Sequence, residues 1–427
     1  MSRNYTPTAT AQSYPDRTGL AGSPLPRPAT TTSEVSFRTS PLEPLENTTP
    51  AGRELGFYIH VPFCRKRCYY CSFNTAPLGD RGEVTRYVDA VTREIELLAS
   101  APLNARRFPI ATVFFGGGTP SLLEPAELAA ILDAIRGGFA LAADAEITVE
   151  CNPESVHRDK LAAYRASGVN RVSLGVQSLD DAILPVLGRL HDRQGARAAF
   201  DAAREAGLEN VSVDLMYGLP GLDVAGWRRG VSQVLDWQPD HLSAYGLTLD
   251  AGSLWGAAGA PPLPAEESTV AQYRGLCEDA GRRGFEHYEI SNWARPGFRS
   301  RHNQIYWRRA EYLAAGPGGC GFVRDVRYGN VKALPRYCAL AEDGRLPVEN
   351  FERLTDRQAL GETLILGLRT SDGVPRARLD ERVAADPGLT RVLQSWRERG
   401  LLIEDAGRLR LSEDGFLLSD ALFVELL

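Results

Sequence analysis

The sequence predicts an α/β fold in which strands and helices alternate along most of the chain. Six short runs rich in apolar and β-forming residues recur between residues 57 and 245, and stretches with helical periodicity separate them. No internal repeat is present beyond this alternation. Strands that alternate with helices form βαβ units and pair in a parallel sheet. Six such units build either a partial (β/α) barrel or a doubly wound sheet, and both folds place their chemistry at the carboxyl ends of the strands.

The predicted strands leave room for a helix between neighbours. They cover residues 57–61, 111–115, 146–149, 171–175, 210–216 and 241–245. The first segment between them is expected to be a helix, because its apolar residues recur at the spacing of one helical face. These residues are Val84, Tyr87, Val88, Val91, Ile95 and Leu98, and Ala196, Ala199, Phe200 and Ala203 repeat the pattern further on.

Length and composition bound the class of protein. The chain has 427 residues, 43% hydrophobic and 24% charged, which indicates a globular protein of two or three domains. Its 48 basic and 54 acidic side chains leave a net charge of −6, so nucleic acid is not expected as a partner. The 7 cysteines are unevenly spaced, which argues against a disulfide framework and favours a reducing compartment, the cytoplasm. No apolar run reaches the roughly 18–20 residues of a membrane span.

Composition divides the chain into four predicted parts. Residues 1–50 hold 8 Pro and 16 Ser or Thr, and we expect a disordered arm there, with a transit peptide as the alternative. Residues 51–255 carry the alternating strands and helices, and residues 256–350 form a linker and extension. Residues 351–427 are expected to form a mainly helical domain.

The last part shows a helix followed by a hairpin. Leu389, Val392, Leu393 and Trp396 share one helical face. Residues 401–411 are expected to form a hairpin that turns at residues 405–407. Helices followed by a hairpin suggest a winged helix, and a packing or docking module is the alternative that the acidic chain favours.

Three cysteines on one short segment carry the clearest chemical signal. Cys64, Cys68 and Cys71 have the spacing C-x3-C-x2-C and directly follow the first predicted strand. Three thiolates can hold three corners of a cubane cluster and leave one iron without a protein ligand, whereas ferredoxin loops supply four. Zinc sites usually show two separated pairs of ligands, and no second pair at that spacing follows here. The alternative is three buried cysteines grouped by chance.

The segment that contains these cysteines, residues 58–71 (YIHVPFCRKRCYYC), closely resembles the cluster loop of radical S-adenosylmethionine (SAM) proteins. More narrowly, it is similar to the oxygen-independent coproporphyrinogen oxidase group and its HemW-type haem-chaperone branch, from about residue 57 to the C-terminus. The resemblance implies a partial (β/α)6 radical-SAM barrel with a C-terminal mainly helical domain. It also implies a [4Fe–4S] cluster on Cys64, Cys68 and Cys71, SAM on the open iron, and a protein that donates electrons to the cluster.

Polar and glycine residues at successive strand ends match the SAM-binding positions of this family. The matching residues are Gly117, Gly118, Thr119, Glu150, Gln177, Arg189 and Asp214, and the aromatic residues Tyr58 and Tyr70. A glycine run leaves room for close approach of a ligand, and an arginine fork suits a carboxylate. Taken singly, these residues also suit tight turns, surface positions or an aromatic core.

Two features bear on the branch of the family. Dehydrogenases that act on coproporphyrinogen III resemble one another in a fourth cysteine two residues after the third, and Phe73 stands at that position here. Residues 302–307 (HNQIYW) match the HNxxYW motif linked to haem in the chaperone branch, and imidazole is a usual axial ligand of haem iron. A histidine in a domain interface is the alternative for His302. Cys320 stands in a glycine-rich loop where relatives commonly carry histidine, and it is the second candidate haem residue.

The resemblance therefore predicts a haem chaperone with haem as cargo. It implies haem-accepting proteins as partners, membrane respiratory enzymes among them. Two enzymatic alternatives remain open: oxygen-independent coproporphyrinogen III dehydrogenase, and a radical-SAM enzyme that opens or methylates haem. Whether the chain catalyses a reaction is not decided by these residues.

Overall fold

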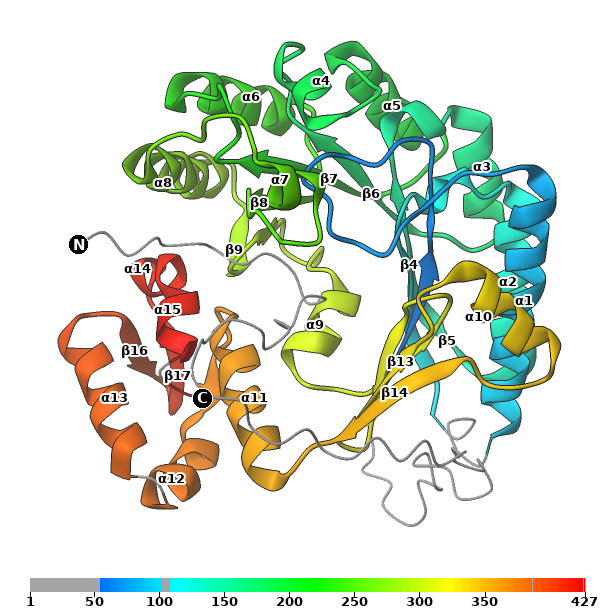
Figure 1. The fold of residues 1–427 in the computed structure, drawn as a ribbon. Coiled ribbons are helices and arrows are strands. Elements are labelled where there is room, and N and C mark those ends of the chain that lie inside the picture. Colours follow the sequence, from blue (N-terminus) through cyan, green and yellow to red (C-terminus); the bar gives the residue numbers. More distant parts are fainter. Residues whose placement is uncertain (1–53, 102–107, 386, 425, 427) are drawn as a thin grey trace.

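The computed structural model describes residues 54–101, 108–385, 387–424 and 426 (Figure 1). The arm predicted at residues 1–50 lies outside the described residues. Within them, no helix is both long and apolar enough to cross a membrane.

Six parallel strands form the centre of the sheet and confirm the predicted α/β class. They pair in the order of the chain, which is the order of a barrel and not of a doubly wound sheet, where the strand order reverses. Each of the six predicted runs lies within one of them. The strands are β1 (Leu55–Val61), β4 (Ile110–Gly117), β5 (Leu141–Cys151), β6 (Arg171–Gln177), β7 (Asn210–Tyr217) and β8 (His241–Gly246).

The helices cover the outer face of this sheet (Figure 1). Helix α1 (Arg81–Ser100) buries all six apolar residues of its predicted face, and its N-terminus is capped by the Asp80 side chain. Helix α5 (Arg193–Glu205) buries its four predicted residues in the same way. The other outer helices are α2 (Pro125–Gly138), α3 (Arg158–Ala166), α6 (Val224–Asp236) and α8 (Glu266–Arg282). Two short helices, α4 (Ile183–Leu187) and α7 (Leu254–Ala258), follow β6 and β8 and contact the segment between the cysteines, because the Tyr69 amide donates to the Leu187 carbonyl and the Trp255 amide donates to the Tyr69 carbonyl.

Residues 286–353 extend the sheet at both edges. Strand β10 (Asn292–Ala294) pairs antiparallel with β8, and β9 (Glu286–Glu289) pairs antiparallel with β10. At the other edge β11 (Tyr312–Ala315) pairs parallel to β1. Beyond it follow β12 (Cys320–Val323), β13 (Val326–Asn330) and β14 (Val348–Arg353), and within the described residues the sheet reaches twelve strands. Helix α10 (Leu334–Glu342) packs on α1.

Helix α9 (Arg301–Trp307) lies on the inner side of the curved sheet, unlike the outer helices (Figure 1). It contacts β1 and β4 on one side and α11 of the C-terminal region on the other. The HNxxYW segment is therefore placed between the barrel and the C-terminal region.

The C-terminal region is mainly helical, as predicted, and has its own hydrophobic core. Its elements are α11 (Asp356–Leu368), β15 (Val374–Pro375), α12 (Arg376–Ala385), α13 (Pro387–Glu398), β16 (Leu402–Asp405), β17 (Arg408–Leu411), α14 (Glu413–Leu417) and α15 (Ser419–Val424). The hairpin turns at Ala406 and Gly407, with φ of 48° and 73°, which is the positive-φ pair of a tight hairpin turn. The first three helices of this region, α11, α12 and α13, together with its three-stranded sheet are typical of a winged helix.

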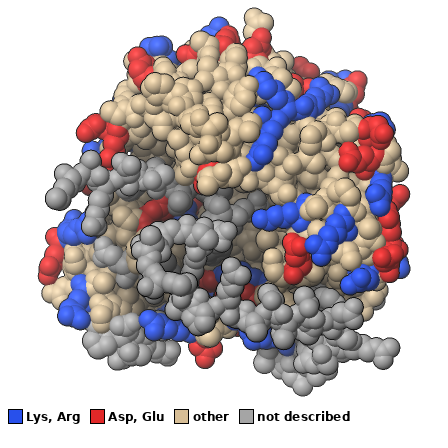
Figure 2. All heavy atoms as spheres, viewed as in Figure 1, with Lys and Arg blue, Asp and Glu red and all other residues tan. Residues whose placement is uncertain are grey.

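Figure 2 shows the same face with its charged side chains. Acidic and basic groups both appear there, separated by uncharged areas, in keeping with the small net charge of −6.

Candidate functional site

The three cysteines of the motif lie on one loop at the carboxyl end of β1. Cys64 ends the short strand β2 (Phe63–Cys64), and Cys68 and Cys71 follow before β3 (Ala76–Pro77), all three half-buried. The Cys71 amide donates to the Cys68 carbonyl at 3.2 Å. The Arg67 guanidinium donates to the Cys71 carbonyl at 3.0 Å and to the Gly252 carbonyl at 2.8 Å. These bonds fix the backbone of the loop that carries the three cysteines.

Two donors reach the cysteine sulfurs from other elements. The Thr119 hydroxyl lies 3.6 Å from the Cys64 sulfur, and Arg189 Nη1 lies 3.6 Å from the Cys68 sulfur. Burial raises the pKa of the Cys64 thiol, and burial raises that of Cys71 to about 11. Binding of a metal cluster here would therefore release protons, since a metal ligand must be a thiolate. Arg189 is placed to offset the negative charge that remains.

The glycine-rich turn after β4 packs its backbone against the cysteine strand. A Cβ at Gly118 would lie 2.6 Å from the Pro62 carbonyl oxygen, so no side chain can be accommodated. Gly117 has a φ of 111°, and a Cβ there would meet the His60 ring at 2.6 Å. The Gly118 amide also donates to the Val61 carbonyl at 2.7 Å. The glycines thus allow two backbones to approach closely beside the cysteines.

A chain of hydrogen bonds joins the polar residues at the strand ends. Arg189 Nη2 donates to the Gly175 carbonyl at 2.5 Å and to Asn152 Oδ1 at 2.8 Å. Asn152 Nδ2 donates in turn to the Thr119 hydroxyl at 3.3 Å. Gln177 ends β6 with a φ of 64°, a left-handed conformation that is uncommon for a residue with a side chain and often marks functional sites. Asn152 bridges Arg189 and Thr119 but was not predicted from the sequence to be a site residue.

Glu150 and Asp214 lie inside the barrel. The Gly117 amide donates to Glu150 Oε2 at 3.2 Å, and Ser173 donates to Asp214 Oδ1 at 2.9 Å. Burial raises the pKa of Glu150 to about 8, with a further rise from the nearby Asp214. Burial also raises the pKa of Asp214, although hydrogen bonds from serine hydroxyls oppose the change. Near neutral pH, Glu150 is therefore largely protonated in this structure.

These two carboxyl groups face a cavity of about 100 Å³ inside the barrel. The cavity extends from the residue after the cysteine loop, Phe73, to the inner side of α9. Its aromatic lining residues are Tyr58, Phe73, Phe114, Tyr245, Tyr306 and Trp307. Its charged lining residues are Glu150, Arg171, Asp214, Glu289 and Arg369. Aromatic walls with a few polar groups are typical of a small-molecule site.

His302 lines this cavity, but both of its ring nitrogens are already engaged. Nδ1 shares a hydrogen bond with the Thr112 hydroxyl at 2.7 Å, and Nε2 shares one with the Tyr306 hydroxyl at 2.8 Å. The ring stacks on Phe114 with centroids 5.0 Å apart. Burial lowers its pKa to about 3, so the imidazole is neutral. As placed, neither nitrogen is available to a metal, and His302 instead holds the Tyr306 hydroxyl.

The other candidate haem residue is Cys320. It is the first residue of β12, it is exposed, and it is not one of the residues that line the cavity. Its loop is nevertheless attached to the cysteine loop, because Asn74 Nδ2 donates to the Pro317 carbonyl at 2.9 Å. Tyr58 and Tyr70 do lie near the predicted centre: Tyr58 bonds His60 Nδ1 at 3.1 Å, and Tyr70 packs beside Trp255.

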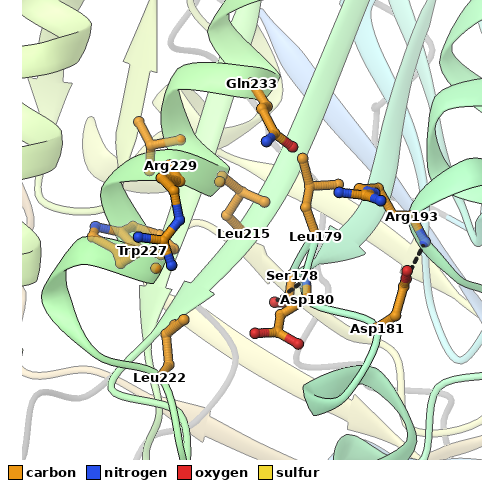
Figure 3. A pocket seen from close by; sticks show the side chains of 13 residues that line it. Ser178, Leu179, Asp180, Asp181, Arg193, Leu215, Leu222, Trp227, Arg229 and Gln233 are labelled. Atoms are coloured by element: carbon orange, nitrogen blue, oxygen red, sulfur yellow. Dashed lines mark hydrogen bonds between the residues drawn. The ribbon is translucent and has the colours of Figure 1, made fainter.

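A second cavity, of about 280 Å³, lies outside the barrel beside α6 (Figure 3). Its acidic residues serve local structure. Asp180 accepts from the Ala182 amide at 2.8 Å, and Asp181 accepts from the Arg193 amide at 2.7 Å (Figure 3). None of the predicted site residues lines this cavity, and we place the functional site in the barrel interior.

Comparison with known proteins agrees with this geometry. Residues 58–228 match the family model of the Radical SAM superfamily, and residues 354–418 match the HemN C-terminal domain. The chain is 39% identical to "Heme chaperone HemW" of Mycobacterium tuberculosis (strain ATCC 25618 / H37Rv), which covers 92% of this chain and 99% of the relative. The protein of that name in Bacillus subtilis (strain 168) is 31% identical, with 86% and 97% covered. "Radical S-adenosyl methionine domain-containing protein 1, mitochondrial" of Bos taurus is 35% identical, with 90% and 89% covered.

Among solved structures, the chain is similar to coproporphyrinogen III oxidase (HemN) from Escherichia coli. The TM-score is 0.77 at 23% identity, with 88% of this chain and 90% of that chain covered. At this identity the likeness establishes the fold, which is the radical SAM fold with a C-terminal helical region.

Proposed function

The chain belongs to the radical SAM superfamily, in the HemN-like branch of HemW proteins, and we propose that it is a haem chaperone that binds haem and passes it to haemoproteins. The observation that carries this proposal is the aromatic cavity between the cysteine loop and α9. It offers flat apolar faces to a macrocycle, and it adjoins the predicted cluster site. The relatives named heme chaperones support the same function.

We further propose that Cys64, Cys68 and Cys71 hold a [4Fe–4S] cluster whose open iron binds SAM. The residues suit such a group: three thiols share one turn, Thr119 and Arg189 donate to sulfur, and Gly118 leaves no room for a side chain. When bound, the cluster supplies an electron that can cleave the sulfonium of SAM. The chain's own contribution is to hold the thiolates and to place a guanidinium beside them.

The SAM-contacting residues proposed from the family lie around this centre. Gly117, Gly118 and Thr119 form the turn beside Cys64, and Arg189 reaches the Cys68 sulfur. Glu150 and Asp214 face the cavity below the turn. The remaining proposed contacts are Gln177, Tyr58 and Tyr70. Tyr58, Glu150 and Asp214 also line the cavity, and its part beside α9 and Phe73 is left for a second ligand, which we propose is haem.

The identity of residue 73 favours the chaperone function over the dehydrogenase function. Phe73 stands where the dehydrogenases carry a fourth cysteine, lines the cavity, and is 39% exposed. An exposed aromatic face suits a ring that must be held and released. We propose that His302 contributes by holding Tyr306 in place, and iron ligation by His302 or Cys320 remains a prediction. The acceptor proteins, the electron donor and a cytoplasmic site of action also remain predictions.

A haem titration of the full-length protein with its cluster reconstituted under anaerobic conditions tests this proposal. We expect one haem per chain, and transfer of that haem to an apo-haemoprotein of low intrinsic affinity. Phe73→Ser should weaken haem binding about tenfold, since it removes an aromatic contact worth roughly 0.5–1.5 kcal/mol in addition to its buried area. The control is Val186→Ser, which changes an equally exposed apolar residue, also at 39%, outside the cavity. Equal effects of the two substitutions, or no stoichiometric haem binding, would contradict the proposal.

A further inference from the structure

The cavity contains a buried arginine that makes no hydrogen bond, although its charge attracts the nearby Glu150 and Asp214. Arg171 begins β6, is 2% exposed and lines the cavity. Its guanidinium makes no hydrogen bond or ion pair with any residue that the structure describes, and its Nε is buried without an acceptor. Burying a charged group without a partner is strongly unfavourable. Such a group in a ligand cavity indicates that the ligand supplies the missing acceptor.

A second arginine in the same cavity comes from the C-terminal region. Arg369 follows α11 directly, and 11% of its side chain is exposed. Its Nε is also buried without an acceptor. The guanidinium lies over the Trp307 ring, 5.0 Å from the centroid, which fixes its orientation. Its Nη1 lies 3.9 Å from Asp420 Oδ1, beyond hydrogen-bond distance.

The carboxyl groups of the cavity do not fully offset these two charges. Burial raises the pKa of Glu150 to about 8 and raises those of Asp214 and Glu289 as well. Each of them is thereby shifted toward its neutral form near pH 7. The cavity therefore favours an anionic ligand, and both guanidinium groups can donate hydrogen bonds to it.

We propose that Arg171 and Arg369 bind carboxylates at the rim of the ligand that fills this cavity. The inference rests on the proposed function, because haem is a planar apolar ring that carries two propionate groups. Aromatic residues hold the ring and the two arginines select its acidic edge. Since Arg369 belongs to the C-terminal region, the ligand bridges that region and the barrel.

Haemin and haemin dimethyl ester, in which both propionates are blocked, separate this inference from general haem binding. Each is titrated into the full-length, cluster-reconstituted protein without SAM. We expect wild type to bind haemin about 10- to 100-fold tighter than the diester, the range for hydrogen bonds to charged groups. Arg171→Gln and Arg369→Gln should each weaken haemin binding by about tenfold or more and leave the diester unchanged. Arg204→Gln is the matched control, because Arg204 pairs with Asp240 at 2.8 Å and does not line the cavity.

Thermal unfolding of the ligand-free proteins excludes a purely structural role. Arg171→Gln should lower the midpoint less than Arg204→Gln does, since Arg171 gives up no hydrogen bond and only its attraction to Glu150 and Asp214, whereas Arg204 gives up its ion pair with Asp240. Equal binding of haemin and diester by wild type would overturn the inference and leave the haem chaperone intact. The same holds if Arg171→Gln lowers the midpoint as much as Arg204→Gln does without reducing discrimination between the two ligands. Failure of both ligands to bind would overturn the proposed function itself.

Discussion

His302 gives the sharpest prediction, because its surroundings determine its charge. The ring is fully buried, both nitrogens are hydrogen-bonded, and burial lowers its pKa from 6.5 to about 3. This difference corresponds to about 5 kcal/mol in favour of the neutral ring. A titration of the protein labelled with carbon-13 at histidine Cε1 should therefore show His302 among the rings that stay neutral down to pH 5, together with His241 and His287, whose pKa values are also lowered by burial. His302→Gln, which keeps a polar group near Tyr306, identifies the His302 resonance by its disappearance.

The same shift has a consequence for stability, with a definite sign. The unfolded chain binds a proton at His302 below pH 6.5, but the folded chain does not until about pH 3. The stabilisation due to a neutral His302 is therefore complete above pH 6.5 and is lost as the pH falls through that window. Between pH 7.5 and 5.0 the loss is about 2 kcal/mol. Other buried histidines add to the wild-type trend, so the measured quantity is the difference between wild type and His302→Gln.

One outcome would refute this reasoning. If the His302 resonance titrates near pH 6.5, then the ring is accessible to protons, at least one nitrogen is free, and direct coordination of haem iron by His302 becomes the better account. If haem addition instead leaves the His302 resonance neutral and hydrogen-bonded, then the histidine acts by positioning Tyr306.

Three further predictions follow from the surroundings of the site. Gly118→Ala should lower the thermal midpoint and prevent cluster reconstitution, because its Cβ would lie 2.6 Å from a backbone oxygen; Gly137→Ala, in open helical space, should cost nothing. Glu94 has a pKa raised by burial from 4.5 to about 7, so its carboxylate destabilises the fold as pH rises; Glu94→Gln should gain up to about 3 kcal/mol relative to wild type between pH 4.5 and 7 in chemical denaturation. Cys68→Ser should abolish the cluster absorbance after reconstitution, whereas Cys277→Ser, a half-buried cysteine outside the loop, should retain it.

The sequence was sufficient for the central strands and the hairpin because local pattern determines both. Each of the six runs is apolar enough to be buried on a parallel sheet, and the Ala406–Gly407 pair suits a positive-φ turn. The strands β11 to β14 were not predicted. They are four to six residues long, and β11 pairs with β1 from more than 250 positions away, which no local periodicity encodes.

Residues at strand ends were predicted as site residues from the sequence, whereas the two arginines of the cavity were not. Gly117, Thr119 and Glu150 could be anticipated because parallel strands bring their carboxyl ends together. Arg171 begins its strand, and Arg369 comes from the C-terminal region, so neither position suggested a site. The HNxxYW motif was visible in the sequence, but its spacing alone cannot show that both ring nitrogens of His302 are hydrogen-bonded.

The central claim is that the cavity binds haem as cargo and does not convert a porphyrinogen. The most direct test incubates the anaerobically reconstituted protein with SAM, a reductant and coproporphyrinogen III, and measures protoporphyrinogen by chromatography and 5′-deoxyadenosine in the same sample. A parallel sample is titrated with haemin. We predict stoichiometric haem binding and no protoporphyrinogen from protein with an intact cluster. Multiple turnovers to protoporphyrinogen would contradict the account and would show that Phe73 is compatible with decarboxylation.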